Sequence, residues 1–213
     1  MLLVSCAVTQ PKESPAVPDS ERMARLEAVF QELLDRPEKG LDPDSIKVLL
    51  TDESLRWLES MEAAAISEPR DQLEARPFNE LLTIVSFRML ERDGQLTGVH
   101  KDRMLYLAAS RKGFLHKAMN LKLGPFEIKN DRGYRGLATS PRVPILFFIW
   151  QDGVWKLDLV STMPVITRGV ETIGVKKKWT QSHAVLYILE KSFRSQLKVA
   201  PDESLLEPRG EQQ

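Results

Sequence analysis

The chain has 213 residues, of which 42% are hydrophobic and 28% are charged, as is typical of a globular domain. Thirty basic and thirty acidic residues cancel, so no net positive charge attracts nucleic acid to the molecule as a whole. No apolar run reaches the roughly 18 residues that a membrane-spanning helix needs, and a single cysteine excludes an internal disulfide.

That cysteine, Cys6, follows Leu3, Val4 and Ser5. An aliphatic residue, a second aliphatic residue, a small residue and then cysteine resembles the lipobox of bacterial lipoproteins. The resemblance implies an acylated Cys6 that anchors the chain in a membrane. The residue after the cysteine is Ala7 and not an aspartate. By resemblance to lipoprotein sorting, this implies the periplasmic face of the outer membrane. Only five residues precede Cys6 and none is basic, so either the true start lies upstream or the match is chance and the protein is cytoplasmic.

Residues 7–20 contain three prolines, no aromatic residue and no helical period. Such a segment cannot bury enough apolar surface to offset the entropy lost on ordering. We therefore interpret residues 1–20 as a truncated signal with lipobox and a disordered tether. A single domain is predicted over 21–197, and a flexible tail over 198–213.

The first half of the domain has helical periodicity. In 22–36, apolar side chains such as Leu26, Phe30 and Leu33 recur at three- and four-residue spacing. Further helices are predicted over 51–65, 77–92 and 97–112, with Pro77 at a helix start and Gly113 at a helix end. A polar gap at 67–76 separates the second from the third.

The second half has strand patterns over 121–128, 134–139, 143–150 and 154–161, and the chain returns to helix after Pro164, with a last helix over 179–197. Asp152-Gly153 between two apolar strands predicts a tight hairpin. A two-residue loop then predicts four cross-strand pairs: Gln151–Val154, Trp150–Trp155, Phe148–Leu157 and Leu146–Leu159.

The two faces of this hairpin differ in character, because strand side chains alternate. One face is wholly apolar and is predicted to face the core. The other carries Ile145, Phe147 and Ile149 opposite Lys156, Asp158 and Val160. Either this second face is solvated, with an ion pair between Lys156 and Asp158, or a partner or a loop covers it.

Helices followed by a meander of strands that ends in Trp155-Lys156-Leu157-Asp158-Leu159 resemble the nuclear transport factor 2-like superfamily. The resemblance implies an α+β fold in which N-terminal helices pack on a curved antiparallel sheet that closes into a cone. The extra segment at 67–76 and the C-terminal helix depart from the family pattern, and they could fill the mouth of the cone.

Catalysis inside such a cone would require an acid–base pair. The candidates by residue type are Asp158, Tyr134, Tyr106, His100 and His116. Asp158 is predicted on the face away from the core. Tyr134 either lies beside a ligand, with small neighbours leaving room, or packs its ring and exposes its hydroxyl.

No cofactor or metal is predicted. His116 and His183 have no second ligand at helical spacing, and the sequence contains no phosphate-binding, dinucleotide-binding, hydrolase or zinc-protease motif. The basic run Lys176–Lys178 could contact anionic headgroups or a phosphate backbone, but we favour a solvated turn before a helix and predict no nucleic-acid partner.

These observations predict a membrane-tethered, non-catalytic binding or protein-interaction domain. Its partner would be a small apolar ligand in the cone, or a protein on the face of Ile145, Phe147 and Ile149. Tyr134 and Asp158 complete the candidate pocket or interaction residues, and no catalytic residue is assigned. The alternative is a cone-type enzyme, an isomerase, cyclase or hydratase, acting on a small apolar substrate.

Overall fold

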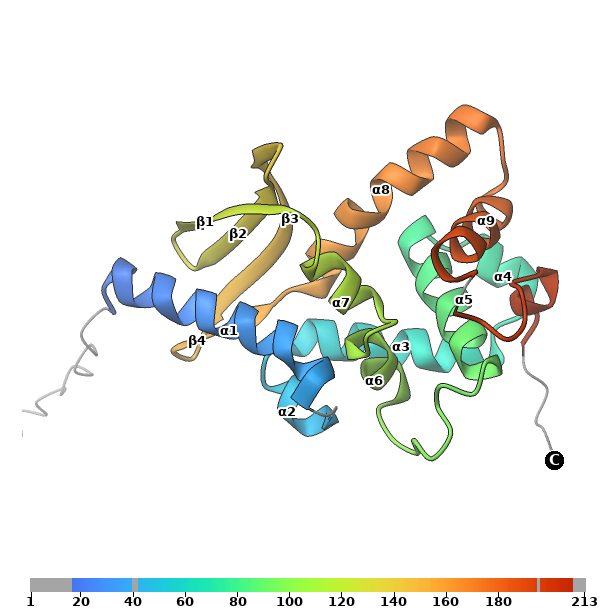
Figure 1. Cartoon of the computed structure of the whole chain (residues 1–213), viewed down its shortest axis with the longest axis horizontal. Coiled ribbons are helices and arrows are strands. Elements are labelled where there is room, and N and C mark those ends of the chain that lie inside the picture. The colour runs from blue at the N-terminus through green and yellow to red at the C-terminus, as the bar shows by residue number, and fades with distance from the viewer. Residues whose placement is uncertain (1–16, 40–41, 195, 209–213) are drawn as a thin grey trace, which may run out of the picture.

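The computed structural model describes residues 17–39, 42–194 and 196–208. Helices and one four-stranded antiparallel sheet make an α+β fold, as predicted (Figure 1). Figure 1 shows that α1 runs along the sheet at one end of the molecule. Helices such as α4, α5 and α9 gather at the opposite end, which we call the helical end. The lipobox with Cys6, and most of the predicted tether, lie outside the described residues.

The N-terminal half is helical, with bounds close to those predicted. It contains α1 (Asp19–Lys39), α2 (Pro43–Lys47), α3 (Asp52–Ser67), α4 (Arg70–Glu74), α5 (Phe78–Arg92), α6 (Arg103–Ala109) and α7 (Phe114–Met119). The helix expected over 97–112 is shorter, because Gly98 (φ 81°) and Asp102 (φ 49°) adopt left-handed backbone conformations that interrupt it. The polar gap at 67–76 holds the short helix α4.

The sheet is a simple meander of β1 (Leu123–Lys129), β2 (Arg132–Leu137), β3 (Ser140–Gln151) and β4 (Val154–Leu157). Three of the predicted hairpin pairs are confirmed: Gln151–Val154, Trp150–Trp155 and Phe148–Leu157. Trp155 is 1% exposed, its ring centroid lies 5.2 Å from that of Trp150, and its Nε1 donates to the carbonyl of Arg22 at 2.7 Å. The predicted burial of Trp155 against Trp150 is therefore confirmed.

The fourth predicted pair, Leu146–Leu159, is wrong because β4 ends early. Helix α8 (Leu159–Lys177) begins directly after Asp158, whose carboxylate accepts hydrogen bonds from Ser161 N at 3.1 Å and Ser161 Oγ at 2.6 Å. The hydroxyl oxygen of Thr162 in α8 accepts from Phe147 N at 3.2 Å. The first turn of α8 thus occupies the place that a longer β4 would have taken beside β3.

Part of the C-terminal segment packs against the helical end of the molecule. After α9 (Gln181–Phe193), the chain forms a short 3₁₀ helix, η1 (Glu203–Leu206). Leu205 and Leu206 are buried, and the Leu205 carbonyl accepts a hydrogen bond from Arg88 at 3.2 Å. Residues 198–208 fall in the segment predicted as a flexible tail, and two apolar side chains there join the core.

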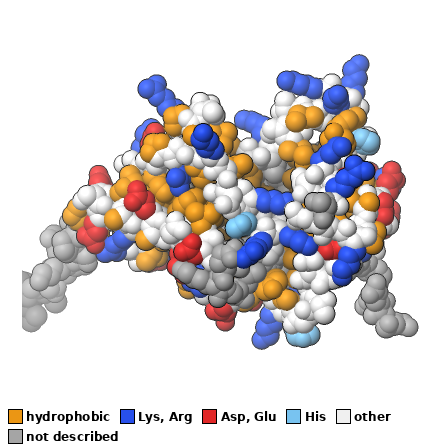
Figure 2. Space-filling view, in the orientation of Figure 1, with side chains coloured by type: hydrophobic (Ala, Val, Ile, Leu, Met, Phe, Trp, Pro, Cys, Tyr) orange, Lys and Arg blue, Asp and Glu red, His pale blue; other side chains and the backbone are white. Residues whose placement is uncertain are grey.

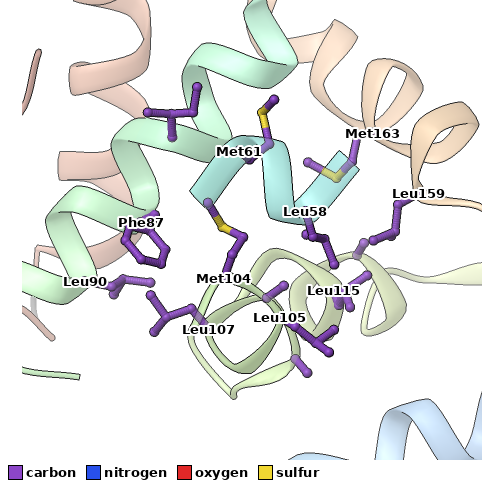
Figure 3. Packing of buried hydrophobic residues seen from close by; sticks show 14 of the residues in the cluster. Leu58, Met61, Phe87, Leu90, Met104, Leu105, Leu107, Leu115, Leu159 and Met163 are labelled. Carbon is purple, nitrogen blue, oxygen red and sulfur yellow. The ribbon is translucent and has the colours of Figure 1, made fainter. Parts of the chain in front are cut away.

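The core continues from the sheet into the helical end of the molecule. Figure 3 shows Leu58 and Met61 of α3, Phe87 of α5, Met104 of α6 and Met163 of α8 converging. Within the described ranges, no helix combines the length and the hydropathy needed to cross a bilayer.

Candidate functional site

The sheet face predicted to carry a site is only partly open. Ile145 is buried, whereas Phe147 and Ile149 are partly exposed. Tyr134 of β2 pairs in register with Phe147, and the two rings meet edge to face with centroids 5.8 Å apart. Tyr134 therefore packs its ring in the sheet, which is the structural alternative foreseen for it.

A groove of about 240 Å³ lies beside Tyr134. Exposed side chains form most of its wall, among them Glu127, Lys129 and Arg142. Glu127 pairs with Tyr134 across β1 and β2. A carboxylate and a phenol are thus adjacent here, but they lie at the surface. Acid–base catalysis typically needs such groups in an apolar interior.

Asp158 is a structural residue. It is buried as the N-cap of α8, with both carboxylate oxygens bonded to Ser161. The ion pair expected between Lys156 and Asp158 is replaced by a long contact of 3.9 Å between Lys156 Nζ and Asp52 Oδ1. Asp158 does not contribute to an open interaction face.

The remaining acid–base candidates do not converge. His100 is exposed in the loop before α6, Tyr106 is in α6, and His116 is in α7. The buried Nδ1 of His116 has no hydrogen-bond partner among the described residues. None of the three lines the groove of Tyr134, and over the described ranges no group of three His, Cys, Asp or Glu side chains could hold a metal ion.

An apolar pocket that the sequence did not indicate lies at the helical end. It has a volume of about 360 Å³ and is enclosed by α5, α6, α7, α8 and α9; we call it the α5–α9 pocket. Figure 3 shows part of its wall, with Phe87 and Leu90 of α5 opposite Met104 and Leu107 of α6. Met163, Ile166 and Val170 of α8 and Ile188, Leu189 and Phe193 of α9 lie on the other side.

Three hydroxyl groups in this wall are already satisfied. Each donates to a carbonyl four residues earlier in its own helix: Thr83 to Asn79 at 2.7 Å, Ser86 to Leu82 at 2.6 Å and Thr167 to Met163 at 2.8 Å. Hydroxyls bonded in this way offer no donor to a ligand. These parts of the wall therefore act as apolar surface with weak acceptors.

Among the described residues, two lysines are the only charged side chains that line the pocket. Lys112 Nζ lies 3.7 Å from Asp93 Oδ2 and donates to the Gln196 carbonyl at 3.3 Å. Lys117 Nζ lies 3.2 Å from the centroid of the Phe193 ring, and burial lowers the pKa of Lys117 to about 8. Within the described part of the chain, no carboxylate pairs with Lys117.

The turn between α6 and α7 places both lysines. A Cβ on Gly113 would lie 2.1 Å from the carbonyl oxygens of Leu107 and Ala108, so only glycine allows the start of α7 to approach the end of α6. Gly113 N donates to Ser110 O at 2.8 Å, and its own carbonyl accepts from Lys117 N at 3.2 Å. The backbone of this turn thereby positions Lys117 at the pocket.

A second, larger groove of about 660 Å³ lies between α1 and β1, on a part of the surface where hydrophobic side chains gather beside α1 (Figure 2). Its wall includes the exposed polar side chains of Glu27 and Gln31. The guanidinium of Arg135 lies 4.5 Å from the ring centroids of both Phe30 and Phe126, and its Nε donates to the Gly124 carbonyl at 2.7 Å. Arg135 therefore occupies the apolar part of this groove.

Neither the sequence nor the structure significantly matches any protein-family model, curated protein or solved structure. The resemblance to the nuclear transport factor 2-like superfamily stays a prediction. Lys117 was missed in the sequence because it looks like the polar side of a short helix. The one signal is its neighbourhood, since Phe114, Leu115, Ala118 and Met119 surround it with apolar side chains.

Proposed function

We propose that the protein is a non-catalytic binding module whose α5–α9 pocket holds a small molecule with an apolar body. The observation that carries this proposal is an apolar pocket of about 360 Å³ between five helices. Ligand sites typically have volumes of about 300–1,000 Å³ and mostly apolar walls with a few placed polar groups. Unfilled apolar space lowers the stability of a folded protein. A ligand that fills the pocket would account for a pocket of this size.

Binding is favoured over catalysis by what surrounds the pocket. An acid–base mechanism needs two titratable groups with different roles. The described lining offers Lys117 and Lys112, of which Lys112 is engaged by Asp93, and it contains no carboxylate, histidine or tyrosine. A cone-type enzyme remains the alternative function, and a tether through an acylated Cys6 remains part of the proposal.

The direct test is titration with N-phenyl-1-naphthylamine, a neutral apolar fluorophore. We expect saturable binding of one molecule per chain. Ser86→Phe should abolish it by filling the pocket from α5, where Ser86 is partly buried. Ser67→Phe is a matched control, because the Ser67 hydroxyl also donates to a carbonyl four residues earlier, at 3.1 Å, but Ser67 is exposed and does not line the pocket.

If Ser86→Phe does not fold, as judged by circular dichroism, Ile166→Trp fills the same pocket from the partly exposed side of α8. Equal binding by the wild type and by folded variants with a filled pocket would contradict the proposal. So would fluorescence that never saturates.

A further inference from the structure

We propose that the α5–α9 pocket selects an anionic amphipath, a molecule with an apolar tail and one acidic head group, and that Lys117 holds the head group. The inference rests on the proposed function, since it names the ligand class for the same pocket. A medium-chain carboxylate is the simplest molecule of this class.

The charged side chains that line the described pocket have one sign. Helices α5, α6, α8 and α9 contribute only apolar and hydroxyl side chains to the lining, and the charged groups are Lys117 of α7 and Lys112 just before it. No acidic side chain lines the described pocket. A cationic ligand would meet only like charge, whereas an anion meets an ammonium in a low-dielectric wall, where the interaction is stronger than in water.

The two lysines differ in what they can offer to a ligand. Lys112 already has Asp93 and the Gln196 carbonyl as partners. Lys117 has the face of Phe193, at 3.2 Å, and no carboxylate among the described residues. The contact between an ammonium and an aromatic ring is electrostatic and does not occupy all three N–H donors of the ammonium. Donors of Lys117 therefore remain for an anion. The fold thus brings a partly desolvated cation to an apolar pocket, and the described residues supply no counterion for it.

The three buried or partly buried hydroxyls described above do not compete with Lys117 for the head group, and the fourth hydroxyl of the wall, that of Ser192, belongs to an exposed residue. Thr83, Ser86 and Thr167 each donate to their own helix, so their oxygens would repel an anion rather than bind it. The head group is therefore expected at the Lys117 edge of the pocket and the tail along the wall of Phe87, Leu107 and Ile166.

The pKa of Lys117 supports this geometry. Burial lowers it to about 8, so the side chain is mostly protonated at pH 7 and mostly neutral at pH 9. Since only the protonated form pairs with an anion, affinity for an anionic ligand should fall about tenfold between these pH values. Affinity for a neutral ligand should not change.

Two fluorophores test the inference, because they share an aromatic body and differ in charge: 1-anilinonaphthalene-8-sulfonate and the neutral N-phenyl-1-naphthylamine. Lys117→Met should weaken binding of the sulfonate about tenfold or more, and should leave the neutral probe unchanged. Lys117→Arg should retain the sulfonate and remove its pH dependence. Lys191→Met is the matched control, since Lys191 also lies over a ring, 5.5 Å from the centroid of Tyr187, but outside the pocket lining.

Competition then identifies the ligand class: decanoate should displace the sulfonate probe from the wild type more strongly than decanol does, and this preference should vanish in Lys117→Met. If the neutral probe binds at one site and Lys117→Met does not affect the sulfonate, the inference is overturned while the proposed function stands. If Lys117→Met weakens both probes equally, Lys117 has only a structural role and the inference also fails. If neither probe shows saturable binding, the proposed function itself fails.

Discussion

Replacing Arg88 by methionine should strongly destabilise the protein. Arg88 of α5 is 1% exposed, and its guanidinium donates to four carbonyls. Three belong to the C-terminal end of α3 and one to η1: Ala65 at 2.8 Å, Ala64 at 3.2 Å, Glu68 at 2.7 Å and Leu205 at 3.2 Å. One side chain therefore satisfies the end of one helix and holds the C-terminal segment.

The size of the effect follows from the partners that lose a donor. The last carbonyls of a helix have no partner within the helix. Ala64 O also accepts from Glu68 N at 2.9 Å, so the loss falls mainly on the carbonyls of Ala65, Glu68 and Leu205. Each buried carbonyl left unsatisfied costs about 1–3 kcal/mol, and relief from burying the guanidinium charge offsets part of the sum. We expect a net loss of about 3–5 kcal/mol.

Urea unfolding followed by circular dichroism measures this loss. Arg92→Met is the control on the same helix, because Arg92 also binds the C-terminal segment, through Asp202 and the Ala200 carbonyl, but at the surface. Its loss should stay below about 1 kcal/mol. Arg88→Lys should fall between the two, because an ammonium lacks the planar fork that reaches several carbonyls. Equal shifts of the unfolding midpoint for Arg88→Met and Arg92→Met, at equal slopes, would refute the reasoning.

Four further predictions follow from the structure. Trp155→Ala should cost about 3–5 kcal/mol, and an unchanged thermal melt would contradict its place in the core. Leu206→Ala should cost about 2–5 kcal/mol while the exposed Val199→Ala costs little; similar unfolding midpoints would show that the C-terminal segment is not packed. Relative to Lys117→Met, the free energy of unfolding of the wild type should rise by about 1 kcal/mol between pH 8 and 10.5, because the folded chain releases the Lys117 proton near pH 8 while the unfolded chain retains it. Palmitate supplied to bacteria expressing the protein should label it through Cys6, and label that persists in Cys6→Ser, or is absent from a chain expressed with its native upstream region, would exclude lipidation at this residue.

Local patterns were sufficient where neighbours in the chain decide the structure. The alternation around Asp152-Gly153 predicted the hairpin register and the burial of Trp155, because a two-residue turn leaves one way to pair the strands. The stripe containing Leu26 and Phe30 predicted α1, because helical spacing brings such side chains to one face. For the same reason the sequence was enough to establish an α+β fold.

Contacts between distant segments decided the rest. Residues after Leu157 have a strand pattern, yet they form α8, and there the hydroxyl of Thr162 accepts from the N–H of Phe147, fifteen residues earlier, which a longer strand would have used. The polar composition after residue 197 suggested a loose tail, but Arg88, more than a hundred residues earlier, supplies a partner for its backbone.

The candidate site belongs wholly to this second class. Five helices separated along the chain enclose the α5–α9 pocket, so no single segment shows its apolar wall. Lys117 is a candidate because the folded chain places the ring of Phe193 against its ammonium group and partly buries that group. The sequence sufficed for elements whose stability is local. The tertiary structure alone decided the pocket and its charge, because burial and electrostatic environment arise from residues that meet only in the folded chain.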